Sequence, residues 1–372
     1  MRRTGIATRR FTLEGYRFDI MGKEVQRLYL RELCSTLSAF DPDWILSYAY
    51  HAPQILPRDT FHEIGVPWVQ VVSNLVYYDE GYFENEHVAV CERNLIPHYR
   101  KRGADHVFAV PLMANFCPEE PVATDGSLPV VFVGNSLGLN SIAVDAWRRK
   151  WSRRARLLPY VEEALQELGD FDRQVHIFQT LDTHPIPDVE NEREHFEVYR
   201  YLLCQATDAR RRRLLEALAP FGLVVYGNWE DRLPPDSPLH PCLRGFLPIN
   251  QENDLYAQGS LFINIHSVGH VTSPNMRFFN IPALGGLQLT DGPFAAFLEP
   301  EVESVFFSSV AELVEKTAYF LAHPAEAEEI RRRGHARVQR QWTYPHWLEW
   351  VLREINVQGP AVSPQGGEVP LS

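Results

Sequence analysis

The chain has few cysteines and a deficit of positive charge, and both shortages exclude classes of protein. Its 372 residues include five cysteines, an odd number, widely spaced and without a C-x-x-C pair. This usage indicates free, mostly buried thiols in a reducing compartment, so we expect a cytoplasmic protein. The 48 acidic residues outnumber the 36 basic ones and give a net charge of −12, which argues against nucleic acid as a partner.

Long apolar runs are also missing. No stretch approaches the roughly 18 apolar residues of a membrane span, and the basic residues 1–11 lack the apolar run of a signal peptide. No His and Cys residues have the spacing of metal ligands, so we expect no metal. An apolar fraction of 45% instead indicates well-packed globular domains, and the length is enough for two.

The first part of the chain alternates predicted strands with predicted helices. Residues 1–22 alternate loosely, as in short strands, and residues 23–40 place leucines on one helical face. Strands that alternate with helices are typical of a parallel, Rossmann-like sheet. The other predicted elements here are strands at Trp44–Tyr50, Trp68–Val72 and His106–Val110 and helices near 57–64 and 94–102.

A segment rich in proline and polar residues, 117–129, is typical of a linker and precedes a second alternating part. Strands are predicted at 129–135 and 222–229. More than 80 residues lie between them, which is longer than one crossover needs, and their pattern predicts a helical insertion over about 141–219. Later predicted elements are a helix at Gln251–Gln258, a strand at Val305–Phe307 and helices at Val310–Leu321 and Tyr344–Ile355.

Residues 262–291 are the most informative segment. Their pattern predicts a strand, a polar loop, a helix from Asn275 to a stop at Gly285-Gly286, and a second strand. The loop that leaves the carboxyl end of a parallel strand is where ligands bind. The backbone N–H groups of Asn275 and Met276 and the guanidinium of Arg277 would suit a phosphate there.

Arg277 carries most of this hypothesis. A cation in the first turn of a helix is mildly unfavourable, because that end of the helix dipole is positive. Either a carboxylate partner or an anionic ligand must therefore offset its charge.

The same segment resembles group 1 glycosyltransferases of the GT-B type, and in particular the branch that includes spore-maturation proteins of the CgeB kind. That branch usually reads N-I-H, then N-M-R-x-F-E, then A-x-G-G-x-x-L-T-D. Earlier motifs also fit its order: F-x-P-D, G-V-P-W-V and V-P-L-M-A-N. The matching signature residues are Asn264, His266, Asn275, Met276, Arg277, Phe279, Gly285, Gly286, Thr290 and Asp291.

The resemblance implies an α/β fold with two Rossmann-like domains that face each other across a cleft. An acceptor-side domain would span 1–120, and a nucleotide-sugar-binding domain 121–340, with the helical insertion inside it. A helix at 341–356 would cross back to the first domain, and residues 357–372 would be a disordered tail. The implied function is metal-independent transfer of a sugar from a nucleotide-sugar donor to an acceptor hydroxyl or amine, with no further cofactor.

In this resemblance the donor diphosphate would contact Arg277 and the start of its helix. His266 would lie near the donor phosphates or sugar, whereas His270 is read as a surface residue. The other expected donor contacts are Ser273, Asn275, Met276, Gly285 and Gly286.

Two positions lack the acidic groups of related enzymes. Asn280 stands where the branch usually has a Glu that accepts hydrogen bonds from the donor ribose, and an amide oxygen can accept one such bond without charge. The broader class often has two Glu eight positions apart, where this chain has Thr272 and Asn280. Acidic catalysis from this loop is therefore excluded.

Glycine and asparagine follow two predicted strands and are further candidates for the donor site. At such strand ends Gly lets backbone approach a ligand closely, although a plain turn explains each pair equally well. The residues concerned are Gly134, Asn135, Gly227, Asn228 and Trp229.

A catalytic base should come from the first domain. An inverting transferase needs a carboxylate or His to deprotonate its acceptor, whereas a retaining one can use the donor phosphate itself. His51 follows one predicted strand and is the preferred candidate; Asp79, after the next strand, is the second. The alternative interpretation is that both are turn residues without a catalytic role.

Three basic stretches, 148–156, 210–213 and 331–340, are typical of solvated helix faces. Residues 147–156 also contain two tryptophans, which would suit peripheral contact with an anionic membrane. Two other functions stay open. One is a nucleotide-sugar-binding or assembly protein without transfer activity, and the other, ranked last, is a nucleotide-sugar epimerase.

Overall fold

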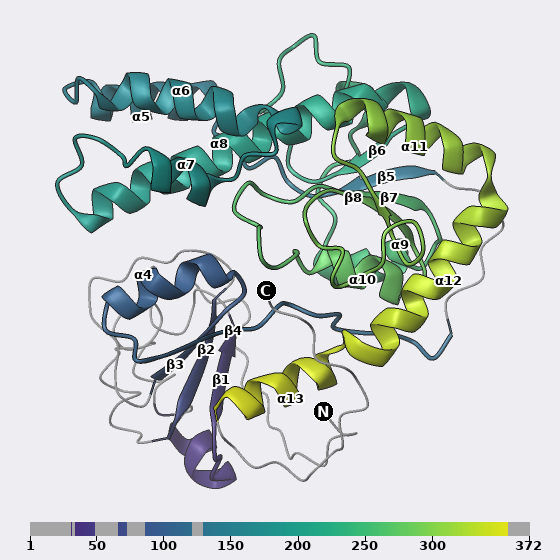
Figure 1. The fold of residues 1–372 in the computed structure, drawn as a ribbon, viewed down its shortest axis with the longest axis horizontal. Coiled ribbons are helices and arrows are strands. Elements are labelled where there is room, and N and C mark those ends of the chain that lie inside the picture. The colour runs from purple at the N-terminus through teal and green to yellow at the C-terminus, as the bar shows by residue number, and fades with distance from the viewer. Residues whose placement is uncertain (1–30, 32–33, 49–65, 73–85, 121–128, 356–372) are drawn as a thin grey trace. The chain divides into compact units, whose positions relative to one another are not determined.

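The structure is a computed structural model that describes residues 31, 34–48, 66–72, 86–120 and 129–355. The predicted strands of residues 1–22, the helix near 57–64 and the tail from 357 lie outside the described residues. The chain divides into two compact units (Figure 1). One holds the described residues up to Pro111 together with those from Pro345 onward, and the other holds Leu112–Tyr344. Residues 112–120, assigned by sequence to the first domain, cluster here with the second unit.

The first unit contains a parallel four-stranded sheet in the order β1-β2-β3-β4. The predicted strand at Trp68–Val72 is found at those residues, and Gly103, with φ of 87°, ends the predicted helix before β4. The sequence pattern did not predict strand β3. Elements are β1 (Ile45–Tyr48), β2 (Trp68–Val72), β3 (Glu86–Val90), η3 (Arg93–Leu95), α4 (Ile96–Lys101), β4 (His106–Ala109) and α13 (Tyr344–Glu354).

The second unit contains a parallel five-stranded sheet in the order β6-β5-β7-β8-β9. Its strands are β5 (Val130–Val133), β6 (Val224–Tyr226), β7 (Leu261–Asn264), β8 (Leu287–Thr290) and β9 (Val305–Phe306). Its helices are α5 (Ser141–Trp151), α6 (Leu157–Gly169), η4 (Phe171–Arg173), α7 (Ile177–Thr183), α8 (Glu192–Leu218), η5 (Ala219–Phe221), η6 (His240–Cys242), α9 (Ile249–Tyr256), α10 (Arg277–Ala283), α11 (Val310–Ala322) and α12 (Pro324–Gln341).

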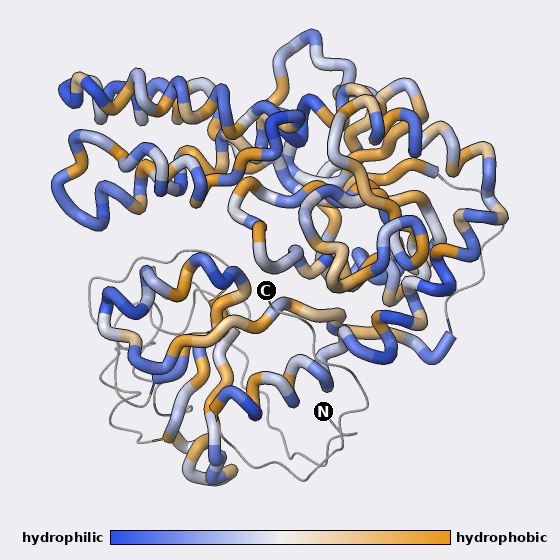
Figure 2. The backbone as a smooth tube through the Cα atoms, viewed as in Figure 1, coloured by the Kyte–Doolittle hydropathy of each residue, from blue (hydrophilic) through white to orange (hydrophobic). Residues whose placement is uncertain are grey.

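Helices cover both faces of this sheet. Side chains alternate along β5, so Val130 and Phe132 join a core cluster with leucines of α8 and α11, whereas Val131 and Val133 join another with α9 and α10. In Figure 2 the strands of this sheet are mostly hydrophobic and α12 is mostly hydrophilic. A parallel sheet buried on both faces is the α/β architecture that the sequence predicts, and the two parallel sheets confirm that fold class.

The stretch between β5 and β6 is helical, as expected, and consists of α5 to α8. Two of its helices, α5 and α8, begin at asparagine caps: Asn140 accepts a hydrogen bond from Ala143 N, and Asn191 accepts one from Glu194 N. Such caps satisfy backbone groups that the first turn leaves without partners.

One expectation from composition is only partly met. All five cysteines are free, but only Cys91 and Cys242 are buried, while Cys34 is exposed. No helix among the described residues is long and apolar enough to cross a membrane.

Candidate functional site

The strand order defines where a ligand would bind in the second unit. The chain leaves β5 toward β6 on one side and leaves β7 toward β8 on the other. In open parallel sheets, ligands bind at the carboxyl ends of two strands where the order reverses in this way. The loops after β5 and β7 therefore frame the candidate site.

Arg211 of α8 reaches this point. Its guanidinium donates to the carbonyl oxygen of Asn135 after β5 (2.8 Å) and to that of Ile265 after β7 (3.3 Å). The residue is 6% exposed. Burial, followed by the nearby charge of Arg277, lowers the pKa of Arg211 to about 10. Arg211 is thus a buried cation at the carboxyl ends of both strands.

Sequence reasoning placed the run 210–213 on a solvated helix face, and this was wrong for two of its members. Arg210 is 7% exposed and donates to the carbonyl oxygen of Leu168 (2.5 Å). Helical periodicity contained the signal, because Arg211 lies on the same face as the buried residues Leu214 and Leu218. Arg331, in the third basic stretch, is likewise buried.

Side chains next to Arg211 attach α8 to the same two loops. Asp208 accepts a hydrogen bond from Ser136 Oγ (2.5 Å) and pairs with Arg212 (3.0 Å). Thr207 accepts one from Val268 N (3.2 Å). The long helix therefore positions the loops that frame the site.

Arg277 is the first residue of α10 and is partly exposed. It is close enough to Arg211 and to Tyr256 to affect both: burial raises the pKa of Tyr256, and Arg277 opposes that shift. Among the described residues, no carboxylate forms an ion pair with Arg277, and its Nε has no hydrogen-bond partner. Of the two expected ways to offset its charge, an anionic ligand is the one that the described residues leave open.

The start of α10 contributes less than the sequence suggested. Asn275 Oδ1 accepts from Phe278 N (3.1 Å), its Nδ2 donates to Asn264 (2.9 Å), and Met276 O accepts from Asn280 N (3.0 Å). Asn275 and Met276 thus organise a helix of seven residues. The charge available to an anion comes from the two arginines.

Asn280 has a structural partner. Its Oδ1, the atom expected to contact a ribose, accepts a hydrogen bond from Asn115 N (3.2 Å), and the residue is 7% exposed. Asn280 therefore holds the segment that begins the second unit against α10.

The glycines after β5 and β6 are needed for packing. Gly227 has φ of 143°, and a Cβ there would collide with the carbonyl oxygen of Gly134. That same oxygen accepts from Trp229 Nε1 (2.7 Å), and Trp229 is fully buried against Phe132. Trp229 is thus a core residue, and its expected donor contact is wrong.

Asn135 and Asn228 do come together. Both are exposed, and Asn135 Oδ1 accepts from Asn228 N (3.0 Å) at the carboxyl ends of their strands.

Gly285 and Gly286 also act structurally. Gly285 has φ of 86° and accepts a hydrogen bond from Arg331, and a Cβ on Gly286 would collide with Phe262. They end α10 against β7 and lie among buried residues.

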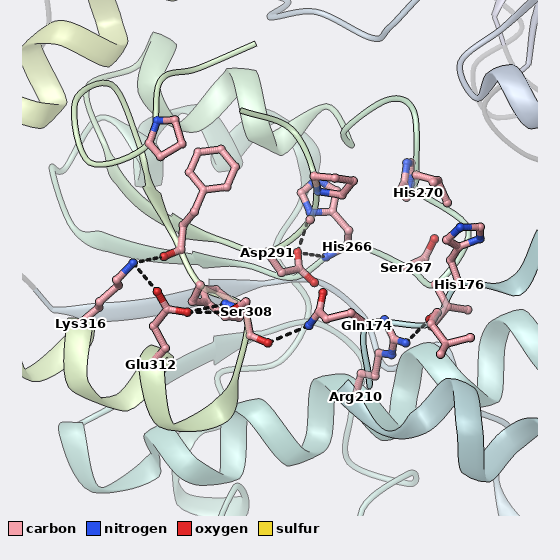
Figure 3. Close-up of a pocket in the computed structure, with 18 of the residues that line it drawn as sticks. Gln174, His176, Arg210, His266, Ser267, His270, Asp291, Ser308, Glu312 and Lys316 are labelled. Carbon is pink, nitrogen blue, oxygen red and sulfur yellow. Dashed lines mark hydrogen bonds and ion pairs between the residues drawn. The ribbon is translucent and has the colours of Figure 1, made fainter. Parts of the chain in front are cut away.

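A cavity of about 510 Å³ opens beside this site, beyond the carboxyl ends of β7, β8 and β9 (Figure 3). It is lined by Gln174, Val175, His176, Arg210, His266, Ser267, Val268, His270, Val271, Asp291, Gly292, Pro293, Pro300, Glu301, Phe306, Phe307, Ser308, Glu312 and Lys316.

His266 and His270 both line this cavity, and they have different hydrogen-bond partners. His266 is 3% exposed and its Nδ1 lies 2.7 Å from Asp291 Oδ1. His270 Nδ1 contacts the carbonyl oxygen of Ser273 (3.0 Å), a residue that is itself buried. Burial, followed by the proximity of His266, lowers the pKa of His270 to about 4. His270, expected to be a surface residue, is therefore a neutral part of the cavity wall.

The remaining predicted features are elsewhere. His51 and Asp79 lie outside the described residues. The peripheral membrane contact at 147–156 is not supported, because Trp151 is buried and Trp147 stacks on Tyr201 with ring centroids 3.8 Å apart. Within the described ranges, no group of three or more His, Cys, Asp or Glu side chains could hold a metal ion.

With this geometry established, comparison with known proteins gives one match to a family. Residues 210–353 match the glycosyl transferase-like family. The matched region begins in α8 and therefore contains Arg211, His266 and Arg277 together. It supports glycosyl transfer as the general kind of activity. No curated protein matches the chain.

Solved structures resemble the chain only distantly. A glycosyltransferase of Rickettsia africae ESF-5 is 12% identical, over 93% of this chain and 85% of that protein, with a TM-score of 0.43. A sucrose-phosphate synthase of Thermosynechococcus elongatus is 12% identical, over 90% and 78%, with a TM-score of 0.44. The HepE protein of Anabaena, in complex with UDP-glucose, is 9% identical, over 89% and 83%, with a TM-score of 0.46. Likeness this distant says nothing about what the chain binds.

Proposed function

We propose that this protein is a glycosyltransferase that moves a sugar from a nucleotide-sugar donor to an acceptor hydroxyl or amine. The observation that carries the proposal is the pair Arg211 and Arg277 at the carboxyl ends of β5 and β7. Neither guanidinium forms an ion pair with a carboxylate among the described residues. The glycosyl transferase-like match over 210–353 supports the same activity.

The two arginines would hold the donor diphosphate and stabilise its charge as it leaves. When the bond between the sugar and the diphosphate breaks, negative charge grows on the phosphate oxygens. Guanidinium groups already in place favour that charge without reorganising. We propose on this basis that transfer needs no metal and no cofactor, with the nucleotide sugar as co-substrate. Free cysteines fit a cytoplasmic site of action.

Nucleotide binding tests the diphosphate assignment. The replacement Arg277→Ala should lower the affinity for a nucleoside diphosphate at least about 10-fold, because a charge-assisted hydrogen bond is lost. Calorimetry with the diphosphates UDP, GDP and dTDP measures this, with the monophosphate CMP for comparison, and EDTA in the buffer should leave the affinity unchanged. Arg337→Ala is the matched control, because Arg337 is also partly buried but pairs with Glu303 (3.6 Å). Unchanged affinity in Arg277→Ala would refute the assignment.

A binding or assembly protein without transfer activity is the second candidate. The engagement of Asn280 by Asn115 favours it, since that oxygen is occupied rather than turned toward a ribose. Donor binding without nucleotide release in the presence of any acceptor would support this candidate over transfer.

A further inference from the structure

His266 is held by two contacts to one carboxylate oxygen. Asp291 Oδ1 lies 2.7 Å from His266 Nδ1 and accepts the backbone N–H of the same residue at 2.9 Å. The two side chains are 3% and 6% exposed. The imidazole also packs on the ring of Phe294, with centroids 4.6 Å apart. The ring orientation is therefore determined by its surroundings.

This pairing decides which ring nitrogen is basic. A carboxylate only accepts hydrogen bonds, so Nδ1 carries the proton in the neutral imidazole and Nε2 has the lone pair. Nε2 is buried and has no hydrogen-bond partner among the described residues, and His266 lines the cavity (Figure 3). An imidazole oriented by a carboxylate in this way is suited to accept a proton.

The other histidines of the cavity are used differently. His176 Nδ1 accepts a hydrogen bond from Gln179 N (3.1 Å) and caps α7, and His270 Nδ1 is bound to Ser273 O. Besides Asp291, the charged groups nearby come from α8: Arg210 lines the same cavity, and Arg211 binds the carbonyl oxygen of Ile265, directly before His266. His266 is therefore the cavity histidine that combines a carboxylate partner with an unpartnered nitrogen.

The paired charges of the wall suit an uncharged, polar ligand. Lys316, on α11, pairs with Glu301 (2.8 Å) and Glu312 (2.7 Å), so these charges compensate one another. The volume of about 510 Å³ is in the range of small-molecule sites. Arg211 binds the carbonyl oxygen of Ile265, the residue directly before His266, so the proposed diphosphate site adjoins the cavity.

We propose that His266, oriented by Asp291, is the general base that deprotonates a carbohydrate acceptor hydroxyl bound in this cavity. The inference rests on the proposed function and deepens it. The hydroxyl oxygen forms the new bond to the anomeric carbon, and the bond from that carbon to the diphosphate breaks with its electron pair. The hydroxyl proton passes to His266 Nε2, while Nδ1–H stays bonded to Asp291. This base lies in the second unit, whereas the sequence placed it at His51 or Asp79.

The test compares donor binding with turnover in His266→Gln, Asp291→Asn and a control. UDP-glucose, UDP-N-acetylglucosamine and GDP-mannose serve as donors, and methyl glucoside serves as the acceptor probe. In His266→Gln, kcat should fall at least about 100-fold, and the donor Kd should be unchanged. His335→Gln is the control, because His335 is equally buried (3%), bonds Ala283 O through Nδ1 (2.9 Å) and does not line the cavity.

Each outcome decides the matter. An unchanged kcat in His266→Gln overturns the assignment of His266 as the base. A loss of kcat in His51→Gln or Asp79→Asn instead would place the base in the first unit. Donor binding by wild type without turnover also overturns it. Wild type that binds none of the donors overturns the proposed function itself.

A second measurement applies if His266→Gln does not fold. In wild-type protein with ¹⁵N-labelled histidine, His266 should show a protonated Nδ1, and its Nε2 resonance should move when methyl glucoside is added. An Nε2 resonance that stays in place overturns the proposal.

Discussion

At the scale of single residues, burial separates charged side chains that look alike in the sequence. Arg210 and Arg211 are buried, whereas Arg213 pairs with Asp170 and Asp172 in a more exposed position. A buried guanidinium is stable only where carbonyl groups or anions accept hydrogen bonds from it. Arg211 has two carbonyl partners, and a donor phosphate would add the anion.

His270 predicts how stability depends on pH. Its pKa in the native state is about 4, below the value of about 6.5 for an unfolded chain. As pH falls from about 6.5 to 4, the unfolded state takes up a proton that the native state does not, so the free energy of unfolding decreases. Urea unfolding at several pH values should show a shallower decrease in His270→Gln than in wild type. Equal slopes would mean that His270 titrates normally in the native state.

At the scale of elements, α8 connects the insertion to the site. Its residues Thr207, Asp208 and Arg211 bind the loops after β5 and β7. Those loops carry Asn135 and His266, so their positions depend on how this helix packs. A pattern of helical periodicity predicts the helix, but it does not say which loops the helix contacts.

The edge between β5 and β6 gives a prediction with a matched pair of glycines. Replacement Gly227→Ala should destabilise by about 2–5 kcal/mol, because a positive φ is combined with a collision with Gly134 O. Gly222 has φ of 71° and open space around it, so Gly222→Ala should cost about 1–2 kcal/mol. Urea unfolding followed by circular dichroism measures both. Similar costs for the two replacements would refute the collision at Gly227.

At the scale of the whole molecule, residues 112–344 form one compact unit, and helices bury both faces of its sheet. A fragment of these residues should therefore unfold cooperatively by itself. It should also bind nucleoside diphosphate with nearly the affinity of the full chain, because Arg211 and Arg277 both belong to it. Thermal unfolding and calorimetry check the two points. A fragment without a cooperative transition would show that the first unit is required for folding.

Much of the fold could be predicted because it follows from local patterns. The strand at Trp68–Val72 and the strand–loop–helix–strand around Arg277 appear close to their predicted bounds. Strand β3 was not predicted, because Glu86 and His87 at its start are polar residues, which are unusual in a buried strand. The candidate site was predicted less well. Arg277 and His266 stand where expected, whereas Trp229 belongs to the core.

The sequence by itself determined the parallel α/β architecture, the helical insertion and the loop that contains Arg277. Periodicity and glycine positions act over a few residues, so they can be read without knowing the fold. Only the tertiary structure decided that Arg211 joins Arg277, that Asn280 binds Asn115, and that His266 pairs with Asp291 beside a cavity. These contacts join residues far apart in the chain. Their partners are selected by packing, for which local sequence carries no signal.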